Sequence, residues 1–318
     1  MRLKKGILCL VLLGVCILVN LIQKKEVYAW NQQYAADVQE EAEFGKIHIE
    51  SDDTYLVTYH DVEGVAFYDV VRQDNLNKNP LILFFPGFNS TKESMYSQAQ
   101  LFANAGYTVV VPDLIGQHES ARTEVMNVFD IISQTSAICD DLLAYYKDSN
   151  IADTEQFSMV GMSMGGMIAL YFTAYSEIRP VCVATMYSTP DFSSIFGGNA
   201  RYMQIINGEA SEMNNEEAKK NYIAAMIQNS PDQNMEYLLQ VPILLINGDR
   251  DHLIPASSIK EFVVKKDFYA NELLSVIREE RGHETCAEDP VDVIRFVYHY
   301  MPAETDSKLL PFILGNIQ

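Results

Sequence analysis

Basic side chains are scarce in this chain. Its 318 residues include 23 lysines and arginines against 43 aspartates and glutamates, which gives a formal net charge of −20 at pH 7. Proteins that bind nucleic acids present lysine and arginine side chains that displace counterions from the phosphates. This balance excludes a nucleic acid as partner, and the acidic surface bears on solubility without indicating a fold.

Cysteine is sparse as well, and the common metal-binding spacings are missing. Two of the five cysteines lie in the apolar N-terminal stretch, and Cys139, Cys182 and Cys286 lie in the body of the chain. Three cysteines cannot all pair, so we expect small buried side chains with at most one disulfide. Neither CxxC nor HExxH occurs, and we expect no metal ion and no cofactor.

Internal repeats and low-complexity tracts are also absent, whereas apolar residues are plentiful. They make up 48% of the chain, and aromatic residues make up 11%. This fraction can fill a sizeable core and excludes wholesale disorder. The length allows one large α/β domain or two small ones.

The N-terminal segment has the composition of an export signal. Three basic residues among the first five precede an apolar run over residues 6–22, and Val27-Tyr28-Ala29 offers small residues to a signal peptidase. The run is slightly short for a spanning helix of about 20 residues. Residues 1–29 are therefore a cleaved signal peptide or an N-terminal membrane anchor. Both alternatives predict a body that is secreted or anchored on the outer face of the cytoplasmic membrane.

Short apolar runs alternate with helical stretches over most of the remaining chain. Strands are predicted over residues 55–60, 65–72, 81–85, 107–112, 157–161, 181–187, 241–247 and 273–278. Helices are predicted over residues 92–105, 124–147, 163–175, 257–266 and 290–300. This alternation predicts an α/β fold with a mostly parallel eight-stranded sheet, helices on both faces and an antiparallel edge formed by the first two strands.

Residues 191–240 interrupt this alternation between two predicted strands. Within them Asn214 can cap a helix with an apolar face. The residues of that face are Tyr222, Ile223, Met226 and Ile227. The insertion is either a lid that adds an adaptable apolar wall to the site or a helical pair that packs on the domain.

After the N-terminal segment, the chain is predicted to consist of a connector over residues 30–45, the domain over 46–302 and a C-terminal tail over 303–318.

The stretch Phe157-Ser-Met-Val-Gly-Met-Ser-Met-Gly-Gly-Met-Ile-Ala-Leu170 joins an apolar strand to an apolar helix through a serine. Gly161, Ser163 and Gly165 fit the GxSxG nucleophile elbow, a strained turn whose flanking positions must lack side chains. The helix beginning at Met164 adds free N–H groups and a partial positive charge, which suit an oxyanion. The pattern alone is weak, but its context makes Ser163 the predicted nucleophile.

A serine hydroxyl needs a base, and the base needs a carboxylate that orients it. His283 is the candidate base, because it follows the last predicted strand in a loop that Gly282 can bend. Asp249 and Asp251 both follow the preceding strand. We choose Asp251, which precedes a segment that would lock the loop, and keep Asp249 as the alternative. The order Ser, Asp, His is the one expected for hydrolases built on such a sheet.

The loop after the third predicted strand offers a second oxyanion donor. In Pro86-Gly87-Phe88-Asn89 the backbone N–H of Phe88 can point at the same oxygen as that of Met164. The candidate residues of the substrate pocket are Phe88, His118, Met162, Phe192 and Tyr202. For His118 a purely structural hydrogen bond is the alternative.

Five motifs together resemble the α/β-hydrolase superfamily: Phe85-Pro-Gly-Phe88, Val111-Pro-Asp113, Gly161-Met-Ser-Met-Gly165, Gly248-Asp-Arg-Asp251 and Gly282-His283. Within it the chain looks most like compact bacterial carboxylesterases related to dienelactone hydrolases and acyl-peptide hydrolases. The resemblance covers about residues 46–302. One position departs from it, since Pro86 stands where the oxyanion loop usually has a histidine.

The resemblance implies a function. In that family a serine attacks an acyl carbon, a histidine moves the proton and an aspartate orients the histidine, and we carry these roles over to Ser163, His283 and Asp251. We therefore expect an exported serine hydrolase that cleaves carboxylic esters of small to medium acyl groups through a covalent acyl-enzyme. A peptidase, a thioesterase or an acyltransferase would use the same triad. A surface binding module without activity is a further alternative, although no member of the triad is missing.

Overall fold

The computed structural model describes residues 48–51, 54–120, 127–149, 151–196, 216–265, 272–308 and 310–311. The chain divides into two units, Met1–His48 and Ile49–Gln318, and nearly all described residues belong to the second. The predicted export segment and connector lie outside the described residues and stay predictions. Among the residues in the ranges above, no helix has both the length and the apolar character needed to cross a membrane.

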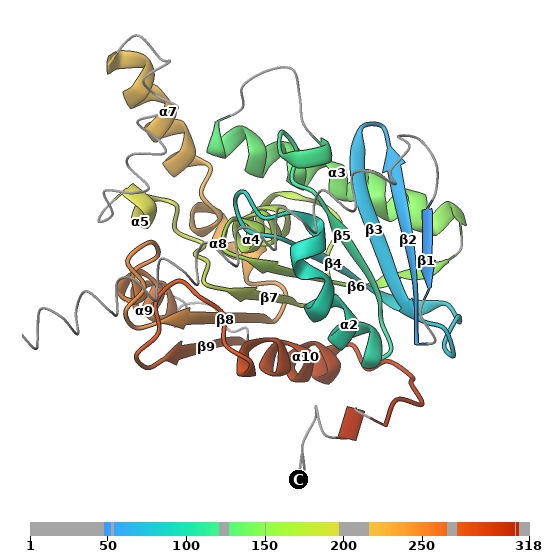
Figure 1. Ribbon diagram of the computed structural model, residues 1–318. Helices are drawn as coiled ribbons and strands as arrows, with labels where there is room; N and C mark the ends of the chain where they lie inside the picture. The colour runs from blue at the N-terminus through green and yellow to red at the C-terminus, as the bar shows by residue number, and fades with distance from the viewer. Residues whose placement is uncertain are drawn as a thin grey trace, which may run out of the picture. The chain divides into compact units, whose positions relative to one another are not determined.

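A nine-stranded sheet forms the centre of the fold, in the order β1-β2-β3-β5-β4-β6-β7-β8-β9 (Figure 1). Its strands are β1 (His48–Ser51), β2 (Tyr55–Val62), β3 (Val65–Arg72), β4 (Asn79–Phe85), β5 (Thr108–Pro112), β6 (Ala152–Met162), β7 (Val183–Met186), β8 (Ile243–Gly248) and β9 (Leu273–Arg278). The six strands β5, β4, β6, β7, β8 and β9 are neighbours in this order and are all parallel. Strand β3 is antiparallel to both of its neighbours, β2 and β5. The eight predicted strands are confirmed. The ninth, β1, was not predicted, because four residues carry too little alternation.

Local sequence explains why these strands form. Glu63 and Gly64 both have positive φ, 54° and 75°, which suits a two-residue hairpin between the right-twisted strands β2 and β3. Strands β4, β5 and β7 are buried along nearly their whole length, as continuous apolar runs predict for strands that are covered on both faces.

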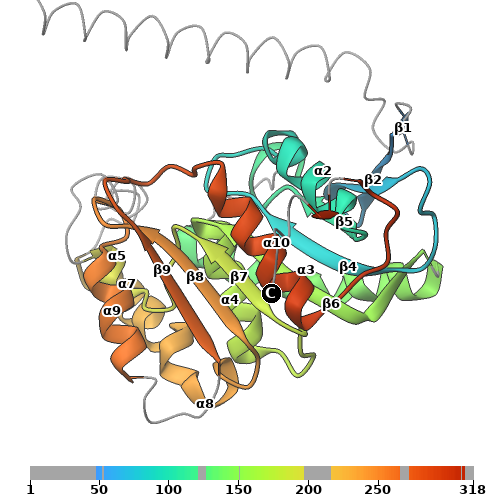
Figure 2. The same cartoon turned by 90° about the horizontal axis from the view of Figure 1, so that it is seen from below.

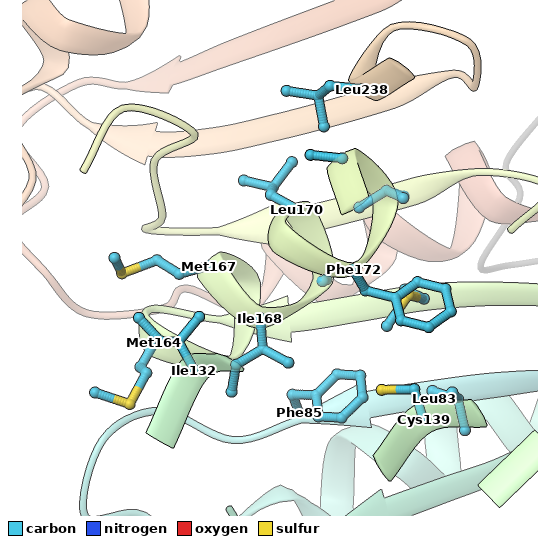
Figure 3. Close-up of a cluster of buried hydrophobic side chains, with 14 of the residues drawn as sticks. Leu83, Phe85, Ile132, Cys139, Met164, Met167, Ile168, Leu170, Phe172 and Leu238 are labelled. Atoms are coloured by element: carbon cyan, nitrogen blue, oxygen red, sulfur yellow. The ribbon is translucent and has the colours of Figure 1, made fainter. Parts of the chain in front are cut away.

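Helices cover both faces of the sheet, as predicted (Figure 2). The main ones are α2 (Tyr96–Asn104, preceded by the 3₁₀ turn η1, Lys92–Met95), α3 (Val128–Ser149), α4 (Met164–Tyr175), α9 (Ala256–Lys265) and α10 (Glu288–Tyr300). One hydrophobic cluster joins α3, α4 and α9 to the sheet, and a second joins α2 and α10 to the other face. Figure 3 shows part of the first cluster, in which Ile168 and Phe172 of α4 lie among Ile132, Phe85 and Cys139. Helix α4 is apolar on nearly every side because it is enclosed by other elements.

The insertion over 191–240 is helical where it is described. It contains α5 (Ser193–Phe196), α7 (Glu216–Gln228), the 3₁₀ turn η3 (Pro231–Asn234) and α8 (Met235–Leu238). Tyr222 and Met226 of α7 are buried in the hydrophobic cluster, which confirms the predicted apolar face. Asn234 Nδ2 donates to the backbone oxygen of Ala174, which ties the insertion to α4. The described part therefore packs on the domain, and the lid function stays a prediction. The cap residue Asn214 lies outside the described residues.

The segment predicted as a tail is docked where it begins. The backbone oxygen of Glu304 accepts a hydrogen bond from Asn75 Nδ2 at 2.9 Å, and the Thr305 hydroxyl donates to the Asn104 backbone oxygen at 3.3 Å. Gly106 has φ +100°, and a Cβ there would lie 2.6 Å from the Glu304 oxygen. The absent side chain lets the C-terminal segment approach, so the domain extends past residue 302.

Two glycines allow β6, α4 and the end of β4 to meet. A Cβ on Gly161 would lie 2.2 Å from the carbonyl carbon of Gly165, and a Cβ on Gly165 would lie 2.2 Å from the Phe85 backbone oxygen. Real Cβ contacts are not this short, so any side chain at either position would force the backbones apart. This crossing positions Ser163, which lies between the two glycines.

We predict that Gly165→Ala destabilises the protein by about 3 kcal/mol or more, because the neighbouring backbone cannot yield as a flexible side chain would. Gly87→Ala is the matched control, since its Cβ would make ordinary contacts of 3.5 Å with Ser163 Cβ and Met162 Cε. We expect it to cost less than about 1 kcal/mol. Urea unfolding of both variants measures the difference, and equal unfolding free energies would contradict the proposed close crossing.

Candidate active site

Ser163 lies at the turn between β6 and α4, with φ 53° and ψ −118°. A non-glycine residue with positive φ is strained, and such strain persists only where the surroundings enforce it. The backbone N–H of Ser163 donates to the Met186 oxygen at 2.8 Å, which fixes the turn against β7. The residue is 6% exposed, and its Oγ lies 2.8 Å from Nε2 of His283.

His283 belongs to the loop between β9 and α10. Its Nδ1 lies 2.7 Å from Oδ2 of Asp251, and its side chain is 18% exposed. A carboxylate can only accept, so Nδ1 carries the hydrogen in this contact and Nε2 is left to accept the Ser163 hydroxyl. The arrangement can therefore remove a proton from Ser163.

Asp251 follows β8 in a tight loop and has a fully buried carboxylate. Its Oδ1 accepts the backbone N–H groups of Leu253 at 2.8 Å and Ile254 at 3.0 Å, which leaves Oδ2 for His283. Asp249, the alternative from the sequence, is exposed, and its Oδ1 accepts the Arg281 N–H at 3.3 Å. The structure thus brings Asp251 and not Asp249 to the histidine.

The two predicted oxyanion donors lie on segments that adjoin Ser163. Met164 is in the first turn of α4, where a backbone N–H has no acceptor within the helix. The Phe88 loop adjoins the serine through Gly87, whose Cβ position is 3.5 Å from Ser163 Cβ. Within the described residues, neither the Phe88 nor the Met164 N–H group has a hydrogen-bond acceptor. Both donors are available to a ligand.

A buried ion cluster lies at the end of the Phe88 loop, where η1 begins. Lys92 is 1% exposed, and its Nζ lies 2.9 Å from Asp113 Oδ2 and 3.0 Å from Glu93 Oε1, with Glu119 also in contact. The Lys92 backbone N–H donates to Asp113 Oδ1 at 2.8 Å. Burial lowers the pKa of Lys92, but these carboxylates raise it by more, so the pKa lies above its ordinary value and the cation persists.

A second contact holds the tip of the same loop. Asn89, with φ 57°, donates its backbone N–H to Oε1 of buried Gln117 at 3.0 Å. No role was predicted from the sequence for Lys92, Asp113 or Gln117. The only signal was the position of Asp113 directly after a buried strand, where polar side chains of α/β sheets gather around a site.

The five pocket candidates are distributed unevenly. Phe88 and Met162 are half-buried. Phe88 belongs to the loop that adjoins Ser163 at Gly87, and Met162 directly precedes Ser163 in the chain. Phe192 is fully buried in the hydrophobic cluster. His118 is exposed with φ 48°, and its side chain makes no hydrogen bond to any described residue, so the structural hydrogen bond considered for it is not present there. Tyr202 lies outside the described residues.

No group of three histidine, cysteine, aspartate or glutamate side chains within the described ranges could hold a metal ion. Cys139 and Cys182 are buried free thiols, and Cys286 is a half-buried one. His60 is buried against Asp69, with Nε2 2.8 Å from Oδ2.

Comparisons with known proteins agree with this architecture. Esterase YjfP of Escherichia coli (strain K12) is 27% identical over 202 residues, which cover 62% of this chain and 77% of that protein. YitV of Bacillus subtilis (strain 168) is 25% identical over 211 residues, which cover 63% and 80%. The acetyl xylan esterase of Paenibacillus sp. R4 superimposes with a TM-score of 0.63 at 14% identity, over 86% of this chain and 93% of that one.

The sequence profile of the dienelactone hydrolase family matches residues 68–277. This match includes Ser163 and Asp251 and ends before His283. The structural neighbours show the α/β-hydrolase fold. The family match and the two relatives make the chain a hydrolase of the esterase type. The chain belongs to the dienelactone hydrolase family and has the fold that its motifs predicted.

Proposed function

We propose that this hydrolase cleaves carboxylic esters with Ser163 as nucleophile, through a covalent acyl-enzyme. The observation that carries the proposal is the unbroken sequence of contacts from Ser163 Oγ to His283 Nε2 at 2.8 Å and from His283 Nδ1 to Asp251 Oδ2 at 2.7 Å. A nucleophile, a base and an orienting carboxylate in hydrogen-bond reach are the geometric mark of this chemistry.

The first half-reaction forms the acyl-enzyme. Ser163 Oγ attacks the ester carbonyl carbon while His283 Nε2 takes the hydroxyl proton, and the carbonyl oxygen becomes an oxyanion. The N–H groups of Met164 and Phe88 are the donors for that oxyanion, aided by the positive end of α4. The tetrahedral intermediate then breaks its bond to the alcohol oxygen, which leaves with the proton from His283.

The second half-reaction releases the acid. A water molecule gives a proton to His283 Nε2 as its oxygen attacks the acyl carbon, and the new intermediate expels Ser163 Oγ, which regains the proton. The Asp251 carboxylate accepts the hydrogen bond from His283 Nδ1 throughout. Its negative charge stabilises the positively charged imidazole that forms in each step. The backbone N–H groups of Leu253 and Ile254 hold the Asp251 carboxylate in place, so it is already oriented before the reaction begins.

The similar proteins support an ester as the substrate over other acyl compounds. Esterase YjfP matches over 77% of its own length, and an acetyl xylan esterase is among the structural neighbours. A peptidase, a thioesterase or an acyltransferase would use the same three side chains with a different leaving group or acceptor.

The direct test replaces Ser163 by alanine in the purified full chain and follows p-nitrophenyl ester turnover. We expect kcat/KM to fall by about 10³-fold or more, because no other side chain supplies the nucleophile. Ser158→Ala is the control, since Ser158 is a fully buried serine on the same strand that contacts Cys182 and Met301. Turnover that survives in Ser163→Ala would overturn the proposal.

A second test separates the two aspartates of the β8 loop. We expect Asp251→Asn to lower kcat by about 10³- to 10⁴-fold, because an amide can donate to Nδ1 and favour the wrong ring tautomer. Asp249→Asn removes a charge two residues away and should change kcat by less than about threefold. Steady-state kinetics of both variants with one ester decide the matter. Equal losses, or the larger loss at Asp249, would contradict the assignment.

A further inference from the structure

Tyr187 has a strained backbone next to the site. It follows β7 directly, has φ 55° and is 1% exposed. Positive φ is costly for a bulky residue, whereas glycine would adopt it without penalty. The backbone N–H of Tyr187 donates to the Ile246 oxygen at 2.6 Å, and the preceding residue, Met186, accepts the N–H of Ser163. A tyrosine held in this conformation indicates that its side chain has a role.

The side chain of Tyr187 reaches the base of the His283 loop. Its hydroxyl donates to Oδ2 of Asp289 at 2.9 Å, and its ring lies edge-on to the His283 ring with centroids 6.0 Å apart. Burial and the contact with Asp289 raise the pKa of Tyr187 above its ordinary value. The phenol therefore stays protonated at neutral pH and acts as the donor.

Asp289 holds both ends of the loop that carries His283. It is fully buried in the first turn of α10. Its Oδ1 accepts from Arg278 Nε at 2.8 Å, where β9 ends, and its Oδ2 accepts the Cys286 backbone N–H at 2.8 Å, where the loop enters α10. One carboxylate thus joins the start of the loop, its end and Tyr187, the residue that follows β7.

The loop has a long distance to bridge. It begins after β9 and must bring His283 back across β8 and β7 to a serine that follows β6, which is three strand spacings or about 14 Å. The His283 side chain is partly exposed, so packing alone does not fix it. Tyr187 lies on the way, one residue from the strand position that fixes the Ser163 turn.

We propose that Tyr187 and Asp289 are positioning residues that set the distance between His283 Nε2 and Ser163 Oγ. The contacts form a closed circuit from Ser163 through β7 and Tyr187 to Asp289, through the loop to His283, and back to Ser163. Neither residue touches the reacting atoms. The proposal rests on the proposed function, because its readout is the turnover that depends on Ser163.

The test is Tyr187→Phe, which keeps the ring against His283 and removes only the hydroxyl that reaches Asp289. We expect kcat to fall about tenfold with KM changed less than twofold, because a misplaced base impairs the chemical step and leaves ester binding intact. Tyr107→Phe is the matched control. Tyr107 is also fully buried, and its hydroxyl donates to the Met301 backbone oxygen at 2.7 Å, away from the loop. It should lower the melting temperature and leave kcat unchanged.

A second pair of variants keeps the proposal testable if Tyr187→Phe does not fold. Asp289→Asn removes the charge that pairs with Arg278, and Asp292→Asn removes the other carboxylate on the same arginine, 2.6 Å from Nη2, without touching the loop. We expect kcat to fall at least tenfold in the first and less than twofold in the second. Wild-type kcat in Tyr187→Phe or Asp289→Asn, or equal losses in a variant and its control, would overturn the proposal. Failure of the proposed function would show separately, as turnover that persists in Ser163→Ala.

Discussion

The structure depends on one backbone constraint, the strained turn at Ser163. A serine with φ 53° costs about 1–3 kcal/mol, and the cost is borne because β6, α4 and the end of β4 cross where Gly161 and Gly165 carry no side chains. The hydrogen bond from the Ser163 N–H to Met186 completes the constraint. A relaxed turn would let the Ser163 hydroxyl rotate out of hydrogen-bond reach of His283.

The sheet order brings the remaining groups to this turn. Because β6, β7, β8 and β9 are parallel neighbours, the loops that follow them open at the same edge. Gly248 lets the β8 loop approach the β9 loop, since a Cβ there would lie 2.3 Å from the Arg281 oxygen. Ion pairs then hold each loop: the buried pair of Lys92 and Asp113 follows the Phe88 loop, and half-buried Arg278 pairs with buried Asp289 at the His283 loop. Replacing one residue of such an ion pair is costly, because the charge of the other residue would be left buried and unpaired.

The sequence predicted the features that depend on local pattern. Continuous apolar runs identified the inner strands, and the glycines around Ser163 identified the turn, because both signals lie within a few neighbouring residues. The short strand β1 has too few residues to show a pattern. Asp249 and Asp251 lie two residues apart in one loop, so the sequence favoured Asp251 but kept Asp249 as the alternative, and the tertiary structure shows that Asp251 is the buried carboxylate. Lys92 pairs with Asp113 across 21 positions, and Tyr187 pairs with Asp289 across 102 positions. Contacts between residues this far apart in the chain leave no local pattern from which they could be predicted.

The central claim is that folding, and not the intrinsic chemistry of serine, makes Ser163 reactive. The most direct measurement is labelling of the full chain with a fluorophosphonate, in buffer and in urea above the unfolding transition, followed by peptide mass mapping. The account predicts that the label is on Ser163 alone in the folded protein and is absent from the unfolded chain. Label on another residue of the folded protein, or equally fast labelling of Ser163 in urea, would contradict it.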